Sequence, residues 1–245
     1  MRMIIARYPH RMTTSRNRIV AILKEGTGYL AARPGQALGI ACLAMALGAL
    51  APLLQVKAGL PDDLDVGMAL GFASILPLEL YFVPRFLIAA DAMAGGSPLN
   101  TAEEWSRHFE ERWLRAFGAK ILLMLVVLVG FLAVLVPGLL VLLFFGWTPL
   151  RVLVRGESLA QAARGSARLM ARAWLPVLAT ALTLAAVYLC CYFAVDALAQ
   201  TLLPDPSAWQ RLTHPIMWLA NFLVGLLNLW LSAGLLALYR SVENA

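Results

Sequence analysis

The sequence has little charge. Only 14% of its 245 residues are Asp, Glu, Lys or Arg, whereas 61% are hydrophobic. In soluble domains, roughly a quarter of the residues are charged. The mean hydropathy is +0.75. A water-soluble domain of this composition would leave much apolar surface in contact with water, so we expect a membrane domain instead.

Histidine and cysteine are also scarce, with three of each. Metal centres and nucleophilic active sites draw heavily on these two residue types. Cys42, Cys190 and Cys191 lie inside apolar runs and do not have the spacing of metal ligands. The sequence contains no H-E-x-x-H, no Walker loop and no G-x-G-x-x-G. We therefore expect no catalytic residues, no metal and no cofactor.

Long apolar runs are what the sequence has in abundance. A helix of about 20 residues crosses a hydrocarbon core of about 30 Å. We predict an all-α, polytopic membrane protein, with a cytoplasmic basic and disordered tail at 1–15 and one six-span domain at 16–245. The six predicted transmembrane helices cover about 37–54, 66–90, 119–136, 138–154, 174–198 and 215–239.

The cations follow the positive-inside pattern of such proteins. With both termini on one side, all of the 20 Lys and Arg residues except Lys57 and Arg211 fall on that side. This predicts cytoplasmic termini, and the abundance of Arg and Ala favours a bacterial inner membrane. The Arg-rich, acid-poor start is also typical of an organelle transit peptide. Because the cations border the spans, we expect anionic lipid headgroups as partners rather than nucleic acid.

The apolar run at 119–154 is too long for one span. Pro137 and Gly138 lie in its middle and favour a tight hairpin between two short spans. The hairpin places Lys120 and Arg151 on the same side of the membrane. A single kinked helix is the alternative, but it would move Arg151 to the outside and spoil the charge distribution.

The cytoplasmic segments carry amphipathic helices. Residues 158–173 place Arg164, Arg168 and Arg172 at i, i+4 and i+8, opposite an apolar face. Residues 101–118 and 16–33 show similar patterns. We predict basic interfacial helices that lie along the inner leaflet. The three arginines either bind anionic headgroups or a protein partner, or simply face the cytosol.

The hairpin and the segment that follows it contain a block of Pro, Gly, Ser and Ala residues at set spacings. The block consists of Val136-Pro137-Gly138, Pro149, Gly156-Glu157-Ser158, Ala162, Ser166, Leu169 and the span that begins at Trp174. It resembles a loose bacterial family, which includes the membrane domain of glycerophosphoryl diester phosphodiesterases and the YciC-like six-span inner-membrane proteins. The resemblance covers about 40 residues, and the six-span layout extends it. It implies architecture and an inner-membrane location, since catalysis in the fused phosphodiesterases belongs to a separate domain.

Glu79 is the most unusual single residue, because it lies near the middle of the predicted second span between Pro77 and Pro84. A charge at the bilayer centre costs about 3 kcal/mol or more, so it usually has a polar partner or a function. On the last span, Asn221 and Asn228 belong to a stripe of amide and small residues. This stripe either packs helices together or lines a substrate path.

The sequence thus predicts an integral inner-membrane protein that supports envelope or lipid homeostasis, alone or as a membrane partner subunit. A small transporter or channel that uses Glu79, Asn221 and Asn228 is the alternative. An intramembrane enzyme is the third and disfavoured possibility. Glu110, Glu111 and Arg115 spell the E-E-x-x-x-R of the CAAX-processing proteases, but the two later histidines of that family cannot be found.

Overall fold

The structure is a computed structural model that describes residues 15–59, 76–95, 102–133, 135–204 and 206–243. These residues form α-helices, one π-helical turn and short connections, and there is no strand among them. The predicted all-α class is therefore confirmed. The chain divides into two compact units, which are described separately. Unit 1 comprises residues 1–27, 87–183 and 233–245, and unit 2 comprises residues 28–86 and 184–232.

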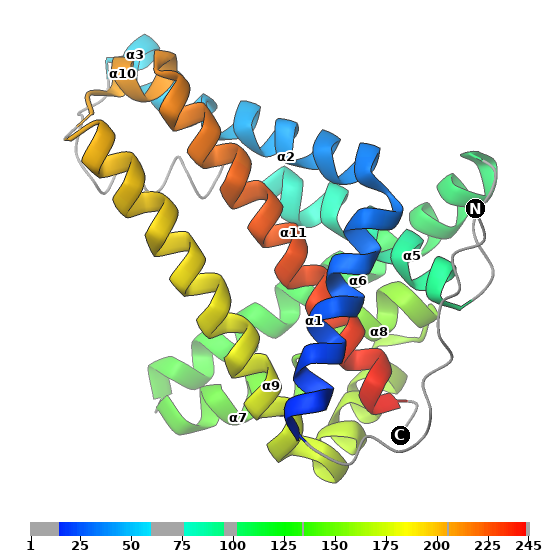
Figure 1. Cartoon of the computed structure of the whole chain (residues 1–245). Coiled ribbons are helices and arrows are strands. Elements are labelled where there is room, and N and C mark those ends of the chain that lie inside the picture. Colours follow the sequence, from blue (N-terminus) through cyan, green and yellow to red (C-terminus); the bar gives the residue numbers. More distant parts are fainter. Residues whose placement is uncertain (1–14, 60–75, 96–101, 134, 205, 244–245) are drawn as a thin grey trace. The chain divides into compact units, whose positions relative to one another are not determined.

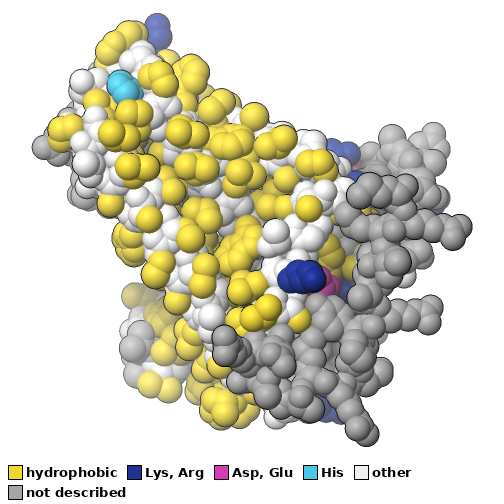
Figure 2. Space-filling view, viewed as in Figure 1, with side chains coloured by type: hydrophobic (Ala, Val, Ile, Leu, Met, Phe, Trp, Pro, Cys, Tyr) yellow, Lys and Arg dark blue, Asp and Glu magenta, His cyan; other side chains and the backbone are white. Residues whose placement is uncertain are grey.

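Within the described residues, five helical stretches are long and apolar enough to cross a membrane. Many large apolar side chains on them are exposed, which water would disfavour and lipid would not. Figure 2 shows apolar side chains over much of the visible face. These findings support a membrane-embedded protein. The five stretches are Pro34–Ala58, Phe109–Leu132, Val136–Arg155, Leu159–Leu202 and Pro215–Glu243.

The predicted second span, at 66–90, has no counterpart among these five helical stretches. Its residues 66–75 lie outside the described part of the chain. The remainder forms η1 (Leu78–Phe82), a π-helical turn, followed by α5 (Val83–Ala94). Six spans therefore stay a prediction.

Unit 1 contains a helical hairpin between α6 (Ala102–Ala133) and α7 (Leu135–Phe145). A Cβ atom built on Gly130 would lie only 2.8 Å from the Cα atom of Gly138, so the two backbones are in close contact. The predicted position of the turn is wrong, because Pro137 and Gly138 lie inside the first turn of α7. Proline suits that turn, where its missing N–H has no helical partner. Gly138 permits the close approach of the helices.

Two further boundaries in unit 1 differ from the prediction. Helix α6 runs without a break from Ala102, so residues 101–118 do not form a separate interfacial helix. The predicted fourth span consists of α7 and α8 (Thr148–Arg155), which are separated by a turn at 146–147. Helix α8 packs against α6.

Helix α9 (Leu159–Leu202) has a break next to the residue at which the fifth span is predicted to begin. Its backbone departs from helical geometry at Ala173, where φ is −138°. Pro176 lies three residues later and cannot donate a hydrogen bond to the carbonyl of Arg172, which explains a break at this level. The kink separates residues 159–172 from the apolar part of the helix (Figure 1).

Helix α1 (Ser15–Ala32) covers the residues that were predicted as a basic interfacial helix at 16–33, and it packs closely against another helix. In unit 1, a Cβ atom on Gly26 would lie 3.1 Å from the Cα atom of Gly234 in α11 (Pro215–Glu243). Ile22 is almost fully buried. Two glycines at one level let the helix backbones approach closely, as is common between helices in lipid. Helix α1 is thus part of the packed helices.

Unit 2 contains α2 (Pro34–Gly48), α3 (Leu50–Ala58) and a short helix, α10 (Ala208–Thr213), that the sequence reading missed. Ser207 and Gln210 form a capping box at the start of α10. Helix α10 packs against α3, where Arg211 donates a hydrogen bond to Gln55 over 3.4 Å. The small residues of α11 pack against α2, since a Cβ atom on Gly225 would lie 2.5 Å from that of Ala44.

Candidate functional site

A network of charged side chains in unit 1 centres on Arg151 of α8. Its Nη2 and Nε atoms donate to the carboxylate of Glu157 over 2.6 and 3.0 Å. Its Nη1 atom donates to Glu243 over 3.2 Å and to the Tyr239 hydroxyl over 3.3 Å. The Tyr239 hydroxyl in turn donates to Glu243 over 2.7 Å. One guanidinium therefore connects α8 to the connection that follows it and to the end of α11.

The local sequence makes room for this arrangement. Helix α8 ends at Gly156, whose φ of 67° lies in the left-handed region that favours glycine. The turn brings Glu157 back towards Arg151. On α9, a Cβ atom at Gly165 would lie 2.6 Å from the guanidinium carbon of Arg151, so glycine leaves the space that the guanidinium occupies. Arg112 donates to the Val154 carbonyl over 2.7 Å and satisfies one of the last carbonyls of α8.

The residues behind the family resemblance have packing roles in this region. Ser158 precedes α9, and its backbone N–H and hydroxyl both bond to the Gln161 side chain, over 3.2 and 3.0 Å. Ala162 and Ser166 are fully buried. The Ser166 hydroxyl donates to the Phe144 carbonyl over 2.7 Å, which fixes α9 against α7. Burial on one face of α9 thus explains the four-residue spacing of Ala162 and Ser166.

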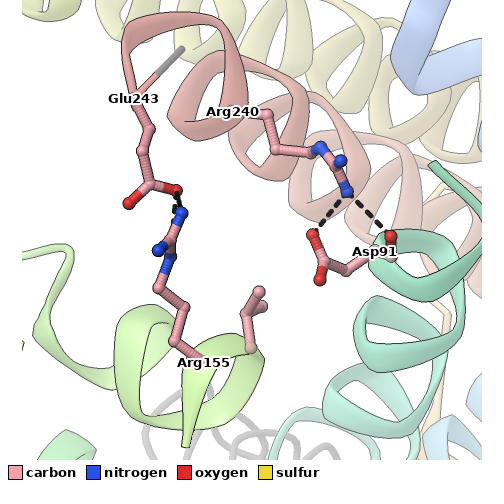
Figure 3. A pocket seen from close by; sticks show the side chains of 5 residues that line it. Asp91, Arg155, Arg240 and Glu243 are labelled. Carbon is pink, nitrogen blue, oxygen red and sulfur yellow. Dashed lines mark hydrogen bonds and ion pairs between the residues drawn. The ribbon is translucent and has the colours of Figure 1, made fainter. Parts of the chain in front are cut away.

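Beside Arg151 lies a small polar pocket of about 180 Å³, lined by Asp91, Val154, Arg155, Arg240 and Glu243 (Figure 3). Arg155 forms an ion pair of 2.5 Å with Glu243. Arg240 donates to both the carboxylate and the backbone carbonyl of Asp91, over 2.6 and 2.7 Å. The pocket therefore lies where α5, α8 and α11 meet within unit 1.

The electrostatics of the pocket are balanced. We call the seven residues Arg151, Arg155, Arg240, Asp91, Glu157, Glu243 and Tyr239 the Arg151 network. Its three arginines face three carboxylates, so it has no net attraction for an anion or a cation. Burial raises the pKa of Asp91 above its ordinary value, although Arg240 opposes this effect. The pocket offers donors and acceptors to a small polar molecule. Nowhere among the described residues do three His, Cys, Asp or Glu side chains gather as a metal site requires.

The three arginines predicted to contact lipid lie outside this network. Arg164, Arg168 and Arg172, here called the arginine row, are all exposed on the first part of α9. Arg164 donates to the Ala160 carbonyl of its own helix. In the described part of the chain, none of the three forms an ion pair.

The predicted polar residues of the last span have helix partners in unit 2. Asn228 accepts a hydrogen bond of 2.8 Å from the Tyr188 hydroxyl of α9. Asn221 lies against Gly48 of α2, where a Cβ atom would be 2.7 Å from the amide carbon of Asn221. The structure brings Asn228 and Asn221 to two different neighbouring helices.

Glu79 is partly buried in the π-helical turn η1. Pro77 immediately precedes this turn, and Pro84 is the second residue of α5. Tyr188, which donates to Asn228, is a residue that the sequence did not predict.

The sequence reading also missed the whole Arg151 network. Arg151 and Arg155 were treated as topological charges, and Glu243 was not considered. The spacing of Arg151 and Arg155 nevertheless indicated an ion-pair site. The two arginines are four residues apart at the end of an apolar run, and such a pair requires counter-charges if it packs inward. The Tyr239 and Glu243 pair, also four residues apart, provides one of those counter-charges.

Comparison of the chain with protein-family models, with curated proteins and with solved structures finds no match. The resemblance to the YciC-like proteins thus stays a prediction.

Proposed function

We propose that this chain is a non-catalytic, multi-pass protein of the bacterial inner membrane that binds anionic phospholipid at its cytoplasmic face. In this role it supports envelope or lipid homeostasis, alone or as the membrane partner of a larger complex. The observation that carries the proposal is the arginine row. Its three side chains are exposed and outside the neutral Arg151 network, while Ala162, Ser166 and Met170 on the other side of the same helix segment are buried.

The position of the row along α9 also supports this proposal. Immediately beyond the kink at Ala173, Trp174 and Leu175 are 48% and 60% exposed. An exposed tryptophan between a basic segment and an apolar one is typical of the membrane interface. Each cation near an anionic leaflet contributes about 1 kcal/mol, so three together favour anionic over neutral lipid by about 3 kcal/mol.

Lipid competition in mixed micelles tests the proposal. We expect native mass spectrometry of the purified protein to detect bound phosphatidylglycerol in preference to phosphatidylcholine. The triple variant Arg164→Gln, Arg168→Gln, Arg172→Gln should lose that preference.

The matched control removes the same number of charges at other exposed positions, with Lys24→Gln, Arg107→Gln and Arg115→Gln. Equal loss in both triple variants would show that only the total charge matters. An unchanged preference in the row variant would refute the proposed binding surface.

A small proton- or cation-coupled transporter is the second candidate function. It is favoured by the π-helical turn at Glu79, since such turns occur often at functional sites. Proteoliposomes with an internal pH dye would test it. Glu79→Gln should abolish a proton flux that the unaltered protein supports, and the absence of any flux in the unaltered protein would count against transport.

A further inference from the structure

An apolar groove of about 350 Å³ lies in unit 2, between the outer part of α9 and the middle of α11. Leu30 at the end of α1 contributes to its lining, so the groove has walls from three helices. None of the residues that line it is charged. Its lining includes Cys191, Val195, Leu223, Leu227 and Trp230.

A hydrogen bond joins two of the helices that line this groove. Tyr188 precedes Cys191 by one helical turn and therefore lies on the same face of α9. Its hydroxyl donates to Asn228 of α11, so the two helices are joined at that level. The side chains of α9 and α11 that line the groove are apolar apart from the thiol of Cys191.

We infer that this groove holds one hydrocarbon chain of a membrane phospholipid. This inference rests on the proposed lipid-binding function and names the part of the lipid that unit 2 takes. Both α9 and α11 are among the apolar helices that are long enough to cross a membrane, so hydrocarbon is the solvent around them. Water does not fill such a space, because a stable water needs two to four polar partners.

A single hydrocarbon chain suits this groove, because it needs no hydrogen-bond partner along its length and the lining is almost entirely apolar.

Two adjacent cysteines provide a matched test. Cys191 lines the groove and is partly buried, whereas Cys190 is exposed and is not among the lining residues. The variant Cys42→Ala, Cys190→Ala leaves only Cys191, and Cys42→Ala, Cys191→Ala leaves only Cys190. The rate of alkylation by N-ethylmaleimide is measured for each delipidated protein in detergent, before and after addition of dioleoyl phosphatidylglycerol or dioleoyl phosphatidylcholine.

Both lipids should slow the alkylation of Cys191, by about tenfold when the lipid is present at ten times its Kd, and leave Cys190 unchanged. Water-soluble glycerophosphoglycerol, which has the headgroup without the chains, should protect neither cysteine. Equal slowing of both cysteines, or of neither, would overturn the inference. Protection of Cys191 that grows with protein concentration in the absence of lipid would also overturn it, because the occupant would then be a second copy.

A larger side chain in the groove tests the site without touching Cys191. Leu227→Phe in the Cys191-only protein should abolish protection by lipid while the protein elutes unchanged in gel filtration. The row variant should keep Cys191 protection by both lipids. Lost protection with intact phosphatidylglycerol preference would refute only the groove, whereas intact protection without any row-dependent preference would refute only the proposed headgroup surface.

Discussion

Gly165→Ala is the substitution whose effect the structure specifies most closely. The added Cβ atom would lie 2.6 Å from both Cζ and Nε of Arg151, and 2.7 Å from its Nη2 atom. The guanidinium therefore has to move. Its side chain is only 12% exposed and holds Glu157 and Glu243, so movement lengthens these ion pairs. We expect the free energy of unfolding to fall by about 1–3 kcal/mol, the usual penalty of overpacking.

Gly118→Ala is the matched control for this change. Gly118 is exposed inside α6, and no atom lies within 4 Å of the position that its Cβ atom would take. Alanine is the better helix former there, so the same chemical change should raise the free energy of unfolding by about 0.5–1 kcal/mol. Unfolding by sodium dodecyl sulfate in mixed micelles, followed by circular dichroism, measures both variants.

A double-mutant cycle isolates the cause. With Arg151→Ala as the background, the guanidinium is absent and Gly165→Ala should no longer destabilise the protein. An equal penalty with and without the Arg151 side chain would refute the reasoning, because the clash would then involve other atoms. A stabilising Gly165→Ala in the unaltered protein would refute it as well.

Three further changes give distinct expected results. Tyr188→Phe removes the hydrogen bond to Asn228. It should lower the free energy of unfolding in micelles by about 0.6 kcal/mol, a typical value for a hydrogen bond between membrane helices, and no change would mean that the bond is not formed. Gly225→Ala adds a Cβ atom that would overlap Ala44 of α2, so it should lower the free energy of unfolding by about 1–3 kcal/mol in the same assay. Because burial raises the pKa of Asp91 in the folded state, its ionisation should reduce stability as the pH rises above 3.8 and through the folded pKa. The unaltered protein should therefore lose stability relative to Asp91→Asn as the pH rises above 3.8, and a relative gain would mean that the ion pair with Arg240 dominates.

The sequence predicted most of the helices because hydropathy and proline positions act locally. The last predicted span begins at residue 215, as α11 does, and the change from a basic to an apolar segment coincides with the kink at Ala173. The exact turn of the hairpin was missed, since Pro137 is equally compatible with a turn and with a first helical turn. Helix α10 was missed because its six residues carry no membrane signal, although Ser207 and Gln210 spell its capping box.

The site was harder to predict, because its contacts join residues that are far apart in the chain. Arg151 meets Glu243 across 92 positions, and Arg240 meets Asp91 across 149. Charge patterning assigns such residues to a side of the membrane and does not reveal how they pair. For Asn228 the sequence predicted the type of contact, a hydrogen bond or close packing between helices, but not the residue that makes it. Its partner Tyr188 lies 40 positions away.

The division of arginines into two groups has a consequence for how the protein responds to mutation. The arginines of the Arg151 network are opposed by equal negative charge, so each stabilises the fold and offers little field to a lipid. Those of the arginine row have no such counter-charge among the described residues, so we expect each to act on the leaflet and to add little to the fold. Positive-inside counting treats both groups alike. Separate measurements of stability and lipid preference should therefore divide them: Arg151→Gln should lower stability and keep the preference, and Arg168→Gln should do the opposite. If both substitutions change the same property, the two groups are not distinct.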